Sequence, residues 1–242
     1  MRAFVAGSML ALCATGALAG PPYVTDDAEP TSAGHWEVNL FTSGAASKTA
    51  SLEQFGVNAS YGVLPDLELN ATFASALDQT AARDAAGLTD LQIGAKYKFL
   101  HQEEDFVDVA VVPGLSLPTH SDHALGFNGV VPSLALQFEK DGDEWSVFGG
   151  GGCNFPGDNL SQDFCLFGAA ATWQVSPTLQ LGAEVYRVTP GARHAEQATN
   201  IGLGAVYDLS EHYHLLASLG PGVQNTSQTS AYAWYFALQV TE

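Results

Sequence analysis

The feature that most constrains the fold of this chain is an alternation of apolar and polar residues with a period of two. The pattern is typical of strands with one apolar and one polar face, because a helix would repeat about every 3.6 residues. It recurs in residues 36–40, 55–61, 67–73, 91–99, 107–111, 134–138, 145–147, 167–173, 179–185, 201–207, 213–219 and 232–240. The seventh of these twelve segments is the weakest, because four glycines, residues 149–152, replace its second half. The sequence therefore predicts an all-β protein.

The connections between these segments alternate in length. Tight connections such as Leu64-Pro65-Asp66 are followed by long, polar or small-residue connections such as residues 43–53 and 74–90. In an antiparallel meander, successive connections fall on opposite rims, so one rim carries short turns and the other long loops. Outer-membrane barrels are built in this way, with an even number of strands. The pattern predicts one domain, residues 34–242, folded as a transmembrane up-and-down antiparallel β-barrel of about 12 strands.

Aromatic residues gather near both predicted rims. Near the short turns lie Trp36, Tyr61, Phe99, Phe106, Phe138, Trp145, Trp173, Tyr207 and Tyr213, and near the long loops lie Phe41, Phe55, Phe73, Tyr186 and Tyr232. Two aromatic girdles are expected at the two headgroup levels of a bilayer. The alternative is a soluble β-sandwich or jelly roll, which would bury the apolar faces in a shared core. In that case Leu69, Ile93, Leu136 and Leu181 would pack against one another.

The first 19 residues have the features of a secretory signal peptide. Arg2 precedes a mostly apolar stretch that is too short to span a membrane, and Ala17-Leu18-Ala19 offers a cleavage site after Ala19. Removing Arg2 leaves seven of the eight basic residues against 26 acidic ones, a net charge of −19. A charge of this sign excludes nucleic acid as a partner, because binding it requires a basic surface.

The polar strand faces are expected to line the barrel interior. The candidates are Glu37, Asn39, Asn58, Glu68, Asn70, Gln92, Lys96, Lys98, Asp108, Glu139, Glu184 and His214. Five carboxylates against two lysines would favour cationic or neutral polar solutes in a water-filled lumen. Alternatively the same groups pair in a closed polar network, since twelve strands enclose less space than the 16 to 18 strands of open porins.

Residues 20–33 precede the first strand at the predicted periplasmic mouth. Three prolines and the lack of alternation argue against a strand. The segment could enter the barrel as a plug or gate, with Tyr23, Val24, Asp26 and Asp27 as the plug candidates. It could also lie on the rim as a tail, because chain termini are mobile unless they are tied down.

The stretch "PPYVTDDAEPTSAGHWEVNLF", residues 21–41, resembles the opening of outer-membrane β-barrels of the meta-pathway phenol-degradation (MetA-pathway) family, which are also labelled transporters. The Pro-Pro-aromatic-Val-Thr-Asp-Asp run and the following His-Trp-Glu carry the resemblance. It implies an outer-membrane location and uptake of small, often aromatic or apolar compounds, and it supplies no catalytic residues.

Other reactive side chains support weaker hypotheses. Cys13 leaves with the signal peptide, so Cys153 and Cys165 are predicted to form a disulfide in an oxidising compartment. His120, Asp122 and His123 have types suited to a transition metal but lack a fourth ligand. A lipid hydrolase could use His123 or His194 with Ser121 or Ser161, although no motif selects these residues. No cofactor and no metal site are predicted.

Together these observations predict a channel or transporter for small molecules in the outer membrane of a Gram-negative bacterium, and no enzymatic activity. The alternatives are an outer-membrane lipid hydrolase and a structural or adhesion barrel that acts through acidic surface loops. The expected partners are outer-membrane lipids and lipopolysaccharide, a small-molecule solute, and the barrel-assembly and periplasmic chaperone machinery during biogenesis.

Overall fold

The computed structural model describes residues 22–81, 83–157, 161–192 and 195–242, so the predicted signal peptide lies outside the described residues. Within these ranges the chain is almost entirely β-structure, and no helix is long and apolar enough to cross a membrane. The elements are β1 (Trp36–Ala46), β2 (Ala50–Leu64), β3 (Leu67–Thr80), β4 (Asp84–Leu88), β5 (Leu91–Leu100), α2 (Gln102–Asp105), β6 (Asp108–Leu117), β7 (Val131–Asp141), β8 (Trp145–Asn154), β9 (Phe164–Ser176), β10 (Leu179–Val188), β11 (Ala198–Asp208), β12 (Tyr213–Gln224) and β13 (Tyr232–Thr241).

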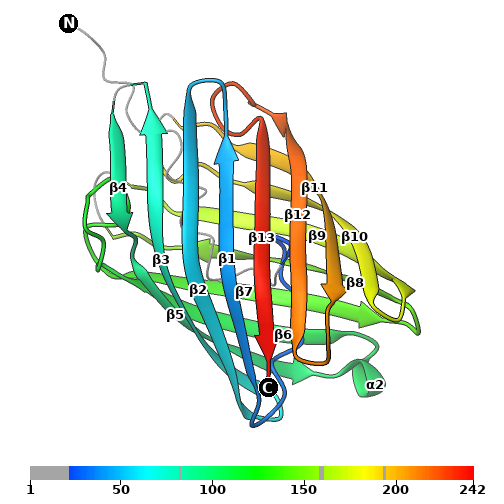
Figure 1. The fold of residues 1–242 in the computed structure, drawn as a ribbon. Coiled ribbons are helices and arrows are strands. Elements are labelled where there is room, and N and C mark those ends of the chain that lie inside the picture. The colour runs from blue at the N-terminus through cyan, green and yellow to red at the C-terminus, as the bar shows by residue number, and fades with distance from the viewer. Residues whose placement is uncertain (1–21, 82, 158–160, 193–194) are drawn as a thin grey trace, which may run out of the picture.

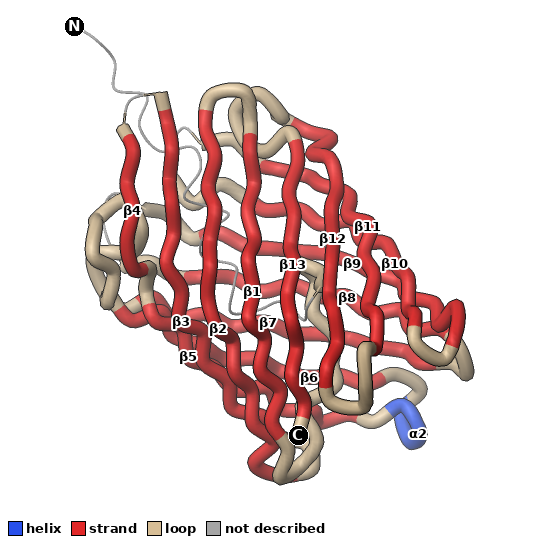
Figure 2. The backbone as a smooth tube through the Cα atoms, in the orientation of Figure 1, coloured by secondary structure: helices blue, strands red, loops and turns tan. Residues whose placement is uncertain are grey.

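The strands form one antiparallel sheet that closes on itself (Figure 1; Figure 2). The last strand, β13, pairs with β1 from Glu37↔Thr241 to Ala46↔Tyr232, while β2 pairs with both β1 and β3. The Trp36 amide donates to the Glu242 carbonyl at 3.0 Å, so the first and last strands meet at one rim. The predicted all-β barrel is therefore confirmed, with twelve strands around its wall and β4 as an additional strand.

The apolar strand faces point outward. Leu69, Ile93, Leu136 and Leu181, which a soluble sandwich would bury together, are between 37 and 51% exposed. Glu68, Gln92, Gln137 and Glu184, which lie on the opposite face of the same strands, are buried. Since an exposed apolar surface of this extent must be covered by something other than water, the structure has the inside-out pattern of a membrane barrel.

The two rims differ in the way that the sequence predicted, with two exceptions. Residues 65–66, 101–107, 142–144, 177–178 and 209–212 connect strands at the short-turn rim, and residues 118–130, 155–163, 189–197 and 225–231 connect them at the long-loop rim. The predicted long connection over residues 43–53 is wrong. Here β1 and β2 extend toward each other and only residues 47–49 join them, because Ala45 and the larger Leu52, which pair across the two strands, continue the buried inner face.

The predicted loop over residues 74–90 is also wrong. β3 continues to Thr80, and its upper part pairs with β4, while its lower part pairs with β5. Alanines alternate with polar residues here, so the pattern is too weakly apolar to indicate strands. Gly87 adopts a φ of +152°, where the Ser121 side chain of the loop at 118–130 approaches it closely. The amide of Leu88 donates to the Ser121 hydroxyl at 2.9 Å, which fixes that loop beside β4.

The glycine run at residues 149–152 does not end the seventh predicted strand. β8 continues to Asn154 and pairs with both β7 and β9 along this run. The ring of Phe167, on β9, lies over Gly151 at the position a Cβ would occupy. Aromatic rings that cover glycines on a neighbouring strand compensate for the missing side chain. The alternation of apolar residues within β8 gives no sign of this cover, because the ring belongs to β9.

Candidate functional site

The N-terminal segment, residues 22–35, lies inside the barrel. The Gly34 amide donates to the Gly62 carbonyl at 2.7 Å, which holds one end of the segment at the short-turn rim on β2. At the other end, the Ser218 hydroxyl donates to the Pro22 carbonyl at 2.7 Å, in the middle of β12. Gly34 has a φ of +83°, a conformation that favours glycine and that turns the chain from the lumen into β1. The segment therefore runs from the rim to mid-height inside the barrel.

Three carboxylates on the wall accept hydrogen bonds from the backbone of this segment. Glu184 on β10 accepts from the amides of Val24 and Thr25 at 3.0 Å each. Glu139 on β7 accepts from the Ala28 amide at 3.1 Å, and Glu68 on β3 accepts from both the amide and the hydroxyl of Thr31 at 2.9 Å. A segment without strand pairing needs other partners for its buried amides. Inward carboxylates supply charge-assisted partners on three sides of the lumen.

A buried lysine reinforces the same attachment. The Lys96 ammonium on β5 lies 3.1 Å from a carboxylate oxygen of Asp26 and 3.1 Å from one of Asp27. Gln137 on β7 donates to the other Asp26 oxygen at 2.9 Å, and Lys98 pairs with Glu29. Burial raises the pKa of the Asp26 carboxyl to about 7, with Asp27 adding to the shift and Lys96 opposing it. Acidic side chains thus occur on both sides of this contact and leave it with an excess of negative charge.

Tyr23 anchors the segment through its ring. The ring meets Phe148 of β8 edge-on, with the centroids 5.9 Å apart. It also lies against Gly182 and Gly204 of β10 and β11, where a Cβ would come within 2.5 Å of it. Any other residue at these two wall positions would push the ring away, so the glycines form a recess for it.

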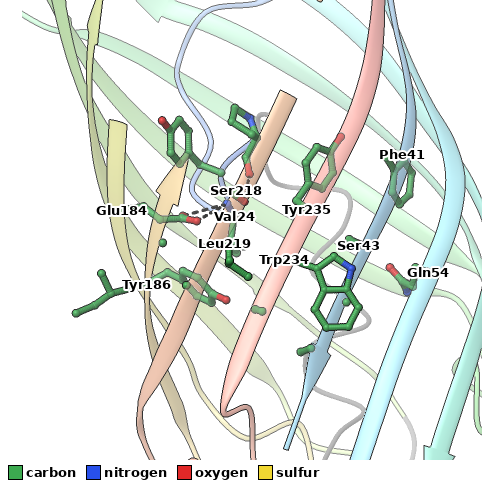
Figure 3. A pocket seen from close by; sticks show the side chains of 18 of the residues that line it. Val24, Phe41, Ser43, Gln54, Glu184, Tyr186, Ser218, Leu219, Trp234 and Tyr235 are labelled. Carbon is green, nitrogen blue, oxygen red and sulfur yellow. Dashed lines mark hydrogen bonds between the residues drawn. The ribbon is translucent and has the colours of Figure 1, made fainter. Parts of the chain in front are cut away.

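Two cavities among the described residues lie inside the barrel, on either side of the N-terminal segment. The outer chamber, of about 130 Å³, is on the side of the long loops and has Pro22, Tyr23 and Val24 in its lining (Figure 3). The inner chamber, of about 590 Å³, opens toward the short-turn rim and is lined by residues 26, 27 and 29–32 of the segment. Around the inner chamber stand the carboxylates of Glu37, Glu68 and Glu211.

The structure brings five of the twelve predicted lumen residues onto the N-terminal segment, namely Glu68, Lys96, Lys98, Glu139 and Glu184. Among the others, Asn39 donates to Glu37, Asn70 donates to Glu68 and Asn58 donates to Thr72. Gln92 is buried, and Asp108 accepts from the Gln102 amide at the start of α2. His214 bonds to Asp208 at 2.6 Å and to Thr241 at 3.2 Å near the rim.

Two aromatic residues assigned to the outer girdle lie inside the barrel instead. Phe41 stacks on Tyr235 with the centroids 5.9 Å apart, and Tyr186 is only 3% exposed. Both line the outer chamber. Their inward positions follow from the alternation along each strand. Phe41 lies on the same strand face as Glu37 and Asn39, and Tyr186 lies on the same face as Glu184. The girdle assignment is wrong because it used the distance of each residue from a rim. The alternation along the strand is the better guide to whether a side chain points into the lumen or outward.

The loop at residues 118–130 reaches into the outer mouth. Leu125 packs with Leu52, Ala76 and Ala85 on the inner face of β2, β3 and β4, and Phe127 stacks on Phe164 of β9. This loop carries the side chains considered for a metal or a hydrolase. His120 bonds to Asp90 at 2.6 Å and Asp122 pairs with Arg83, so both have other partners. His194 lies outside the described residues, and no group of three or more metal-ligating side chains occurs within them.

The predicted disulfide is confirmed. Cys153 and Cys165 are bonded, and they are directly opposite each other on β8 and β9 at the start of the loop at residues 155–163. The bond ties together two strands next to Phe164, which contacts Phe127 of the mouth loop. Its place in the fold is that of a brace on the long-loop rim.

Known structures share this architecture. The COG4313 outer membrane channel from Pseudomonas putida F1 superposes with a TM-score of 0.68 at 17% sequence identity, covering 89% of this chain and 97% of that one. The NanC porin gives a TM-score of 0.56 at 11% identity, covering 85% and 99% of the two chains. The KdgM porin in complex with disordered oligogalacturonate gives 0.53 at 10% identity, covering 84% and 98%. At these identities the likeness establishes the fold.

Sequence comparison establishes the family. No curated protein matches the chain. A family model described as "Putative MetA-pathway of phenol degradation" matches residues 23–239, which include the N-terminal segment from Tyr23 and nearly all of the barrel. The chain therefore belongs to this family, as the stretch at residues 21–41 indicated.

Proposed function

We propose that the protein is an outer-membrane channel for small solutes, in which the N-terminal segment acts as a plug between two chambers. The observation that carries this proposal is the attachment of residues 22–31 to the wall by Glu68, Lys96, Glu139 and Glu184, which come from four different strands around the lumen. The outward apolar face supports a position among outer-membrane lipids and lipopolysaccharide, reached through a leader at residues 1–19 and the barrel-assembly and chaperone machinery. The similar structures include an outer membrane channel and porins.

The charge of the lumen favours neutral and cationic solutes. Five inward carboxylates stand against Lys96 and Lys98 on the wall, and Asp26, Asp27 and Glu29 are added by the N-terminal segment. A pore lined by one sign of charge raises the local concentration of the opposite sign and excludes ions of the same sign. The oligogalacturonate in complex with the KdgM porin is a polyanion, and this lumen has the opposite preference.

The test is liposome swelling with the purified protein and three sugars of similar size, namely glucosamine, glucose and glucuronate. We expect glucosamine and glucose to enter faster than glucuronate. Replacing residues 22–31 by a Gly-Ser segment of the same length should raise all three rates, because the tether stays but the wall contacts are lost. Permeability equal to that of protein-free vesicles, for both the native protein and this variant, would remove the channel from consideration.

The pH dependence of the plug has a definite sign. The Asp26 carboxyl has a pKa of about 7 when the segment is docked, against an ordinary value of 3.8, so docking takes up a proton between these pH values. Docking is therefore strongest in acid and weakens as the pH rises toward 7. We expect single-channel conductance to rise from pH 4 to pH 7. Asp26→Asn should reduce this rise and Asp105→Asn, on the exposed α2, should not. A rise in conductance on acidification would contradict the assignment.

A further inference from the structure

The outer chamber has aromatic walls. Phe41 and Tyr235 stand on neighbouring strands with nearly parallel rings, at an interplanar angle of 13°. Tyr23 and Tyr186 contribute two more rings from the side of β10, and Val24 and Leu52 add aliphatic surface. Figure 3 shows Tyr186 and Tyr235 on opposite sides of Val24. A cavity lined in this way favours a flat, apolar molecule, because ring stacking adds to the effect of apolar burial.

Two tyrosine hydroxyls in this lining, those of Tyr23 and Tyr186, lack a hydrogen-bond partner among the described residues. The hydroxyl of Tyr186 is buried and makes no hydrogen bond within the described part of the chain. It points from β10 toward the side of the chamber formed by β13 and β1 (Figure 3). Buried tyrosine hydroxyls usually have a hydrogen-bond partner, and leaving one without a partner is unfavourable. A ligand with a donor or acceptor at its edge would satisfy it.

The charge of the chamber lining further restricts the class of ligand that the chamber can bind. Among the described residues that line the chamber, the charged side chain is that of Glu184. Its carboxylate oxygens already accept hydrogen bonds from the amides of Val24 and Thr25. A second carboxylate brought into this space would meet Glu184 with no basic side chain in the described lining to offset it. The chamber therefore disfavours anions and accepts neutral molecules.

We propose that the outer chamber is a binding site for a neutral aromatic alcohol, whose ring packs against Phe41 and Tyr235 and whose hydroxyl bonds to the Tyr186 hydroxyl. This inference deepens the proposed channel function, on which it rests, by naming a substrate class and the residues that select it. The chamber lies on the long-loop side of the N-terminal segment, so a solute entering from outside would occupy it before it reached the plug.

The test measures binding of 4-fluorobenzyl alcohol to the detergent-solubilised full-length protein by ¹⁹F NMR. We expect saturable binding, which Tyr186→Phe weakens about five- to tenfold, the usual effect of one hydrogen bond. The variant keeps the ring and loses no protein hydrogen bond, so it should fold. Tyr207→Phe removes a hydroxyl from the outward face and should bind as the native protein does. Phe41→Leu should weaken the aromatic alcohol more than competing cyclohexylmethanol, and 4-fluorobenzoate should not bind.

Each outcome separates this inference from the channel function. Equal binding by Tyr186→Phe and Tyr207→Phe would overturn the site, because the alcohol would then be dissolving in the detergent. Equal binding of 4-fluorobenzoate would overturn the charge selection. If the sugars enter liposomes but no aromatic alcohol binds, the inference fails and the channel stands. If the alcohol binds with the expected Tyr186 dependence but no solute enters liposomes, the site stands and the channel function fails.

Discussion

Lys96→Met is expected to release the N-terminal segment and to raise single-channel conductance at pH 7.5 at least about tenfold. Lys96 is buried between Asp26 and Asp27, so its loss leaves these two carboxyl groups in the barrel interior without their cation, and Asp26, whose pKa Lys96 lowers, must stay charged or take up a proton there. Removing one partner of a buried ion pair costs up to about 3–5 kcal/mol, and uptake of a proton by Asp26 reduces this cost. Undocking returns both aspartates to water and relieves this cost. Planar-bilayer recording measures the change directly.

Lys98→Met is the matched control. Lys98 lies two residues along the same strand and pairs with Glu29, whose side chain is 58% exposed. The Lys98 side chain is only 11% exposed, but its partner is open to solvent, and ion pairs that solvent reaches contribute about 0–1 kcal/mol, so conductance should change much less than in Lys96→Met. A triple variant, Lys96→Met with Asp26→Asn and Asp27→Asn, removes both sides of the buried cluster and should dock again. If Lys96→Met and Lys98→Met both conduct like the native protein, the buried contact does not hold the segment in place.

Leu203→Arg is expected to destabilise the folded barrel in lipid by about 2–4 kcal/mol, the range for a cationic residue at the bilayer midplane. Leu203 lies at the centre of β11 and is 67% exposed on the outward face. Because the surrounding acyl chains cannot hydrate a guanidinium, the cost follows from the position of the side chain in the membrane. Guanidinium unfolding in phospholipid vesicles, followed by tryptophan fluorescence, measures the difference in unfolding free energy.

Leu209→Arg supplies the comparison for this second prediction. Leu209 is exposed to a similar degree but lies in the turn at residues 209–212, at the level where a bilayer meets water. The same substitution there should cost no more than about 1 kcal/mol. Equal effects at the two positions would mean that the outward face does not contact hydrocarbon, and the membrane assignment would fail.

The alternation of residues was sufficient to predict the barrel and the inward set of side chains. The sequence of each strand indicates which of its side chains point inward, because successive side chains point to opposite sides of a sheet. The direction of Phe41 and Tyr186 is predicted wrongly because their closeness to a rim was used in place of the alternation. The strand β4 is missed because its residues are too small to show an apolar pattern. The glycine run in β8 was misjudged because the Phe167 ring that covers Gly151 belongs to another strand.

The sequence by itself therefore determined the architecture, since facing and turn length are local properties that neighbouring residues encode. Only the tertiary structure decided the arrangement of the lumen. Val24 meets Glu184 across 160 residues of sequence, and Lys96 meets Asp26 across 70. Such contacts depend on the closure of the sheet, which determines which strands face each other across the interior. The alternation within one strand contains no information about which distant strand lies opposite it.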